Sequence, residues 1–193
     1  MTSDKNRNGV ASNVRLIGLL TEVSHKDSQN KYLLDLYKRH DKYSPDSLVQ
    51  EIREDASNTL LRPFKGSPNY DEVVRMVAEK IGIKKQELTE DEAENELLIL
   101  QKMLKDYVKK HPEAEEKLNM QVKEMGEGYT DVLSLLKMNS TRSLLAVASV
   151  LTGIMPGIVT AAAIAGPAWR KIVPSVIDIA ALRLQQKQEG TPS

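Results

Sequence analysis

Apolar residues recur at spacings of three and four along most of the chain, which is the period of an amphipathic α-helix. One clear stripe runs from Tyr70 to Ile81, and another lines the segment from Ala93 to Val108. Shorter stripes with the same spacing lie within residues 14–23, 32–37, 48–56, 118–125 and 132–136. No stretch combines sustained strand alternation with turn residues, so the pattern predicts no sheet. We therefore expect an all-α fold, a multi-helix bundle.

Residues that begin helices precede several of these stripes. Ser12 is a candidate N-cap for the first helix. Pro45 suits a first helical position, and the helix that carries the Tyr70 stripe is expected to begin at Ser67-Pro68. These signals place helix starts near residues 12, 45 and 67.

A capping box and two stop signals bound the later helices. Thr89 and Glu92 fit the box in which a threonine caps the helix and a glutamate reaches back to it. Gly82 suits the left-handed residue after a helix, and His111-Pro112 stops the helix that follows Thr89.

The 27 residues from Ser143 to Trp169 carry no charge. About 20 apolar residues span a bilayer as a helix, so insertion is one interpretation, with Trp169 and Arg170 as interfacial anchors. Pro156-Gly157 divides the run, which favours an apolar C-terminal helical hairpin buried in the bundle, before a last helix near Pro174. Both interpretations stay open, and the candidate membrane segment comprises Leu144, Val150, Ile154, Ile158, Ile164 and Trp169.

The amino-acid composition argues against several classes of function. Lys+Arg and Asp+Glu are equal at 27 each, so the chain lacks the basic excess typical of nucleic-acid binders. It contains no cysteine, which excludes a disulfide framework and a thiolate metal site. Nucleic acid is therefore not an expected partner.

Catalytic and metal-binding motifs are missing from the sequence. Its three histidines show no metal-ligand spacing, and no phosphate-binding glycine loop or nucleophile elbow occurs. Five acids between Glu90 and Glu96 are dense, but they suit capping and solubility better than acid–base chemistry. We expect no enzyme activity, no catalytic or metal site and no cofactor.

The C-terminal string from Ala165 to Arg183, which includes Gly166-Pro167 and Pro174, resembles the ending of the bacterial YaaW family. A second similar stretch contains Asn58-Thr59-Leu60, Lys65-Gly66 and residues 70–83, and Glu94, Glu96, Leu97 and Leu98 resemble the family's E-x-x-L-L helix. The family is grouped with ubiquinol–cytochrome c chaperones, which are helical assembly factors without catalytic activity. The resemblance implies an all-helical protein with a binding role, and it carries over no catalytic residues.

These observations predict one helical domain at residues 12–186 between disordered tails at 1–11 and 187–193. Within it, amphipathic helices occupy residues 12–140, and the apolar hairpin and final helix occupy 141–186. The expected function is non-enzymatic binding of a protein partner, in the manner of an assembly chaperone; the alternative is a membrane-active protein. We expect a cytoplasmic protein, peripheral or integral at the inner membrane in the alternative, and self-association into a homo-oligomer fits either. The candidate recognition residues are Arg62, Phe64, Tyr70, Trp169, Arg170 and Arg183.

Overall fold

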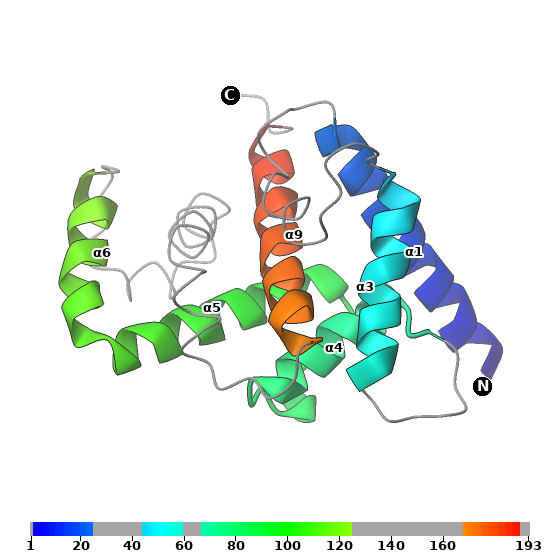
Figure 1. The fold of residues 1–193 in the computed structure, drawn as a ribbon, viewed down its shortest axis with the longest axis horizontal. Coiled ribbons are helices and arrows are strands. Elements are labelled where there is room, and N and C mark those ends of the chain that lie inside the picture. The colour runs from blue at the N-terminus through cyan, green and yellow to red at the C-terminus, as the bar shows by residue number, and fades with distance from the viewer. Residues whose placement is uncertain (1, 25–43, 60–66, 125–167, 190–193) are drawn as a thin grey trace.

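The computed structural model describes residues 2–24, 44–59, 67–124 and 168–189 (Figure 1). In chain order these residues form α1 (Thr2–Ser24), α3 (Pro45–Thr59), α4 (Tyr70–Lys80), the 3-10 turn η1 (Lys85–Glu87), α5 (Glu92–Lys110), α6 (Pro112–Glu124) and α9 (Trp169–Glu189). No strand occurs in these ranges, which confirms the all-α prediction for them. The apolar hairpin lies outside the described residues, as do the helices expected at 30–40 and 131–137 and the loop at 60–66.

Helix α9 is the central element of the bundle. It packs against α3 and α5 and also contacts α4 and α1, while α1 packs on α3 and α4 (Figure 1). Every residue from Ile172 to Leu182 is buried. Apart from Ser175 and Asp178 these residues are apolar, and a helix that is largely apolar all round belongs in a core. Helix α6 extends from the far end of α5, away from the ribbons of α1 and α3 (Figure 1).

The predicted buried face of α3 is confirmed. Pro45 is its first residue, and Leu48, Val49, Ile52 and Ala56 all lie in the core. A proline suits this position because its missing N–H is one that the first turn leaves unpaired anyway.

Helix α4 begins two residues later than expected, at Tyr70 instead of at Ser67-Pro68. Asn69 is the N-cap residue, and its backbone N–H donates to the Glu72 carboxylate at 3.0 Å. Arg53 of α3 holds the preceding segment by donating to the Pro68 carbonyl at 2.7 Å. The predicted stop is confirmed, since Gly82 has φ +90° just after the helix.

The prediction that residues 1–11 form a disordered tail with Ser12 as N-cap is wrong. Helix α1 begins at Thr2 and continues through Ser12 to Ser24. The segment contains no proline, so nothing in it stops the backbone from continuing the helix. A polar composition alone does not distinguish a helix end from a tail.

Helix α9 also starts earlier than predicted, at Trp169 instead of near Pro174. The Ala168 carbonyl accepts from the Lys171 and Ile172 N–H groups at 3.0 Å each, which closes a first turn before the proline. The helix extends to Glu189, so residues 187–189 are helical and not part of a tail.

The predicted capping box of α5 is wrong as well. Asp91 is the N-cap, and its carboxylate accepts from the Ala93 N–H at 2.8 Å. Thr89 is instead held by the buried Asn95, whose side chain pairs with the Thr89 backbone N–H at 2.9 Å and carbonyl at 3.0 Å. Glu92 is therefore free of a capping role and turns into the core. The predicted end at Lys110 and His111-Pro112 is confirmed.

Candidate functional site

Two buried glutamates and an arginine form the centre of a polar cluster inside the bundle. Nε of Arg183 donates to Oε2 of Glu96 at 2.8 Å, and Nη2 donates to Oε1 of Glu96 at 3.2 Å and to Oε1 of Glu92 at 3.0 Å. The side chains of Glu92 and Glu96 are only 2% and 1% exposed. The two acids lie four residues apart on α5, so they share one face, and Arg183 reaches both from α9.

Tyr70, the first residue of α4, joins this centre from a third helix. Its hydroxyl donates to Oε1 of Glu96 at 2.9 Å, and the whole residue is buried. A buried tyrosine needs a partner for its O–H, and Glu96 supplies it. The apolar body of the ring meanwhile packs in the core with Val73, Val74 and Val77 of the same helix.

Helix α1 completes the cluster with Ser12, and the exposed Arg15 lies at its edge. The buried Ser12 hydroxyl donates to Oε2 of Glu92, and Nη2 of Arg15 lies 3.2 Å from the same oxygen. The carboxylate oxygens of Glu92 and Glu96 therefore all accept from protein donors. Ser12, Tyr70, Glu92, Glu96 and Arg183 are called the junction cluster below.

Residues of α1 also cap α4. The Tyr70 N–H donates to Oδ1 of Asn13 at 2.9 Å, and the Asp71 N–H donates to Oγ of Ser12 at 3.0 Å. Nδ2 of Asn13 donates in turn to Oδ1 of Asn69 at 2.9 Å. The first N–H groups of a helix have no partner within it, so α1 satisfies two of the unpaired donors of α4.

Burial is the main influence on the electrostatics of the cluster. It raises the pKa of Glu96, and the charge of Arg183 opposes that effect without cancelling it. Burial also raises the pKa of Tyr70 well above its usual value, with the Glu96 charge acting in the same direction. For Arg183 burial acts to lower the pKa, but the charge and hydrogen bonds of Glu96 raise it overall.

Asp71 lies beside the cluster at the start of α4. Burial, and after it the charge of Glu72, raises the pKa of its carboxyl group. Its Oδ1 atom is buried and has no hydrogen-bond partner among the described residues. A partly desolvated carboxylate at this point costs stability when it is ionised.

The cluster is suited to fixing helix packing. Its charged groups are hydrogen-bonded to one another and lie away from solvent, which is how proteins accommodate ions in a core. No group of three His, Asp or Glu side chains that would hold a metal ion occurs in the described ranges.

The structure separates the predicted recognition residues. Trp169 is half-buried and Arg170 exposed at the start of α9, whereas Tyr70 is buried and Arg183 is 15% exposed in the junction cluster. The prediction that Tyr70 and Arg183 form a recognition surface is therefore wrong, because Glu96 binds both of them inside the bundle. Arg62 and Phe64 lie outside the described residues.

The membrane prediction falls mostly on sequence that the structure does not describe. Leu144, Val150, Ile154, Ile158 and Ile164 lie there, and only Trp169 of the candidate segment is placed. Among the helices that the structure does describe, none has both the length and the apolar character needed to cross a bilayer.

Sequence reasoning missed Ser12, Glu92 and Glu96 as interior residues. One signal was available on α5: stepping back by four residues along its buried face from Leu104 leads through Leu100 to Glu96 and Glu92. A second was Arg183, which with Asp178 interrupts the mostly apolar stretch 172–184, since a buried arginine requires an acidic partner. Nothing comparable marks Ser12.

Comparisons with protein-family models, with curated proteins and with solved structures find no match for this chain.

Proposed function

We propose that this chain is a non-enzymatic binding protein of the assembly-chaperone type, as its resemblance to the YaaW family implies. The observation that supports this proposal is that the buried ionisable residues of the bundle hydrogen-bond to one another. These residues are Glu92, Glu96, Arg183 and Tyr70. We therefore expect the outer surface of the bundle to bind the partner, which we expect to be a protein.

Within the described residues, the start of α9 is the part of the predicted recognition surface that remains accessible. Arg170 is exposed, and its neighbour Trp169 is half-buried. Tryptophan and arginine are enriched among residues that dominate binding energies, because each combines a large contact area with polar groups. This pair supports a recognition role for the α9 start.

The test compares two double variants of the full chain. Trp169→Ala/Arg170→Ala removes the proposed contacts, and Lys109→Ala/Lys110→Ala changes exposed residues at the end of α5 as a control. After circular dichroism has established equal helix content, both are used as bait beside the wild type. We expect a specific partner to be recovered by the wild type and the control but lost from the first variant. Equal recovery by all three contradicts this binding site.

Membrane association is the second candidate function. Its support is the continuity between the uncharged run that ends at Trp169 and the exposed cations Arg170 and Lys171 that follow it. Lys80 adds a third exposed cation at the same place, since its Nζ atom lies 5.4 Å from the centre of the Trp169 ring. A cytoplasmic protein bound at the inner membrane is consistent with this candidate.

A further inference from the structure

Four residues form a mixed basic and aromatic surface at the start of α9, which we name the α9 entry patch: Lys80, Trp169, Arg170 and Lys171. Lys80, at the C-terminal end of α4, places its ammonium group over the Trp169 ring at 5.4 Å. All three cations are exposed, and Trp169 is partly buried against the core. Two helices thus present cations around one aromatic side chain.

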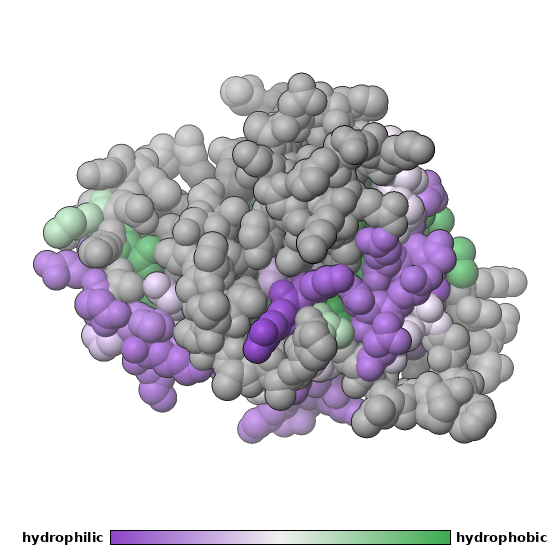
Figure 2. All heavy atoms as spheres, viewed as in Figure 1, coloured by the Kyte–Doolittle hydropathy of each residue, from purple (hydrophilic) through white to green (hydrophobic). Residues whose placement is uncertain are grey.

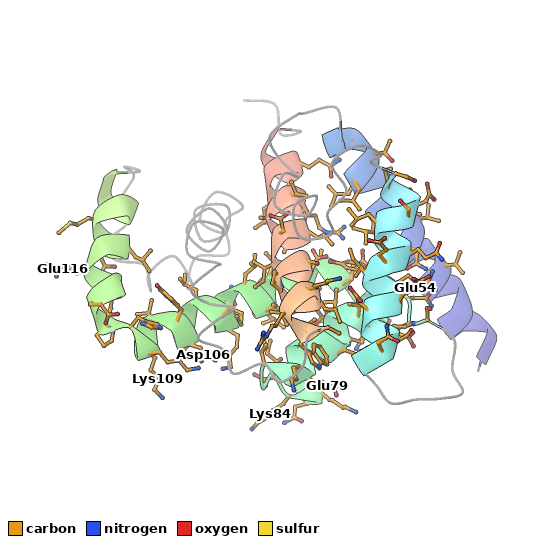
Figure 3. The ribbon with its side chains drawn as sticks, viewed as in Figure 1. Glu54, Glu79, Lys84, Asp106, Lys109 and Glu116 are labelled. Carbon is orange, nitrogen blue, oxygen red and sulfur yellow. The ribbon has the colours of Figure 1, made fainter. Side chains whose placement is uncertain are left out.

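The surroundings of the patch keep a positive balance. Lys84 and Lys85 lie four and five residues after the end of α4, and Figure 3 shows Lys84 near Glu79 at that end of the helix. Three carboxylates lie nearby: Asp55 pairs with Lys171 at 3.5 Å, Glu79 pairs with Lys85 at 3.7 Å, and Glu87 accepts from the Lys84 backbone at 2.9 Å. Asp55 offsets Lys171, which leaves Lys80 and Arg170 as the patch cations for which the described residues provide no ion pair.

Helix stability does not account for the cations on α9. Its first turn contains Arg170 and Lys171 and no acid. The amino end of a helix favours negative charge, and each cation there is unfavourable by about 0.3–1 kcal/mol at an exposed site. Asp55 accounts for Lys171 through their ion pair, whereas the placement of Arg170 is better explained by an anionic surface outside the protein.

The sequence that precedes the patch indicates that this anionic surface is a lipid bilayer. The 26 residues from Ser143 to Ala168 carry no charge, and they end at the patch. A bilayer combines an apolar interior with anionic headgroups at its boundary, where tryptophan is enriched and cations are attracted. A nucleic acid presents anions without an adjoining apolar phase, so it fits this arrangement less well.

We propose that the α9 entry patch docks on an anionic lipid surface, with Trp169 at headgroup level and Lys80, Arg170 and Lys171 against lipid phosphates. This inference rests on the membrane-associated candidate function and specifies its lipid chemistry. Lys84 adds to the attraction from the turn that follows α4.

Trp169 is the one tryptophan of the chain, so its emission reports directly on the patch. The full chain is mixed with vesicles of phosphatidylcholine alone or with added phosphatidylglycerol, and flotation and tryptophan emission are measured at low and high salt. We expect flotation with the anionic vesicles, a blue shift of Trp169 emission, and loss of both at high salt. The neutral vesicles should produce neither.

Two variants with equal charge change assign the binding to the patch. Lys80→Gln/Lys84→Gln/Arg170→Gln removes two cations of the patch and the neighbouring Lys84. Lys105→Gln/Lys109→Gln/Lys110→Gln removes three exposed cations from α5, where Figure 3 shows Lys109 near the start of α6. Near an anionic surface each cation contributes about fivefold in affinity, so the first variant should bind on the order of 100-fold more weakly. The second should remain within about threefold of the wild type, as expected for cations far from the lipid surface.

The outcomes separate the inference from the function on which it rests. Equal flotation with neutral and anionic vesicles would leave membrane association standing and overturn the anionic docking site. Absence of flotation with either overturns both. Unchanged binding of the Lys80/Lys84/Arg170 variant, or anionic binding of the wild type without an emission shift, overturns the assignment to the α9 entry patch.

Discussion

Arg183 and Glu96 form a two-point contact across the bundle, with Nε and Nη2 of the guanidinium donating to the two carboxylate oxygens at 2.8 and 3.2 Å. Apolar packing alone specifies the rotation of α9 weakly, because the helix is buried on all sides from Ile172 to Leu182. A paired arginine and carboxylate have directional geometry that apolar contacts lack. We therefore expect this pair to fix the rotation and height of α9 relative to α5.

Arg183→Leu should destabilise the protein by about 3–5 kcal/mol, because it leaves two carboxylates buried without their cation. The free energy of unfolding in urea measures the effect. Arg183→Leu/Glu96→Leu should recover part of the loss, and the double-mutant cycle gives the coupling energy of the pair. A loss below about 1 kcal/mol for Arg183→Leu would show that the buried charges are not coupled as the geometry indicates.

Ser12→Ala should cost about 1–3 kcal/mol. The substitution removes a donor to Glu92 and leaves the Asp71 N–H without its acceptor, and buried polar groups that lose a partner carry this penalty. Thr21→Ala is the control on the same helix, because its hydroxyl makes an exposed contact with the Ile17 carbonyl. The control should change the unfolding free energy by less than about 0.5 kcal/mol. Equal effects at the two positions would refute the role given to Ser12.

Two glycine substitutions should act in opposite directions. Gly82→Ala is expected to destabilise by about 1–2 kcal/mol, since φ +90° is unfavourable for an L-residue with a side chain. Gly18 lies inside α1, and an added Cβ would meet nothing within 4 Å, so Gly18→Ala should stabilise by about 0.5–1 kcal/mol. Thermal unfolding of both variants tests the pair. A stabilising Gly82→Ala would be inconsistent with the left-handed turn after α4.

Asp71→Asn should change how stability depends on pH. The pKa of Asp71 is raised in the folded state, so its contribution to stability is fully present below the unfolded pKa and is lost as the pH rises through the folded pKa. The variant lacks this loss. The stability of the variant relative to the wild type should therefore be higher at pH 7 than at about pH 4, near the unfolded pKa.

Denaturant unfolding across this range measures the difference. Glu79→Gln removes one charge from the exposed far end of α4 and serves as the reference variant. If Asp71→Asn and the reference follow the same pH profile, burial of the Asp71 carboxyl is not what penalises its ionised form.

Local periodicity predicted the faces of α3 and α4 correctly, because each consists of an apolar stripe that one side of a helix can bury. Leu48 and Ile52 on α3, and Val73 and Val77 on α4, are buried as expected. The surface of the described residues is correspondingly polar in the view of Figure 2, with small green areas on α1 and α6, the two helices that carry the exposed Val10, Val14 and Met120.

The junction cluster was harder to predict, because its residues are defined by tertiary contacts. Glu92 fits a capping box from local sequence, but Asp91 caps the helix, and Arg183 then draws Glu92 inward across 91 sequence positions. Ser12 likewise fits an N-cap from local sequence, but its contacts are tertiary. Its hydroxyl does accept from the amide of a helix start, but the helix is α4 and not its own.

Capping of α4 by α1 has a consequence for the order in which the chain becomes structured. The Tyr70 and Asp71 amides find their acceptors 57 and 59 residues earlier, so the first turn of α4 is not fully hydrogen-bonded until a long loop has closed. These two amides should therefore exchange with deuterium whenever α1 undocks, even while the rest of α4 stays protected. The exchange rates of these two α4 amides therefore report how often α1 detaches from α4.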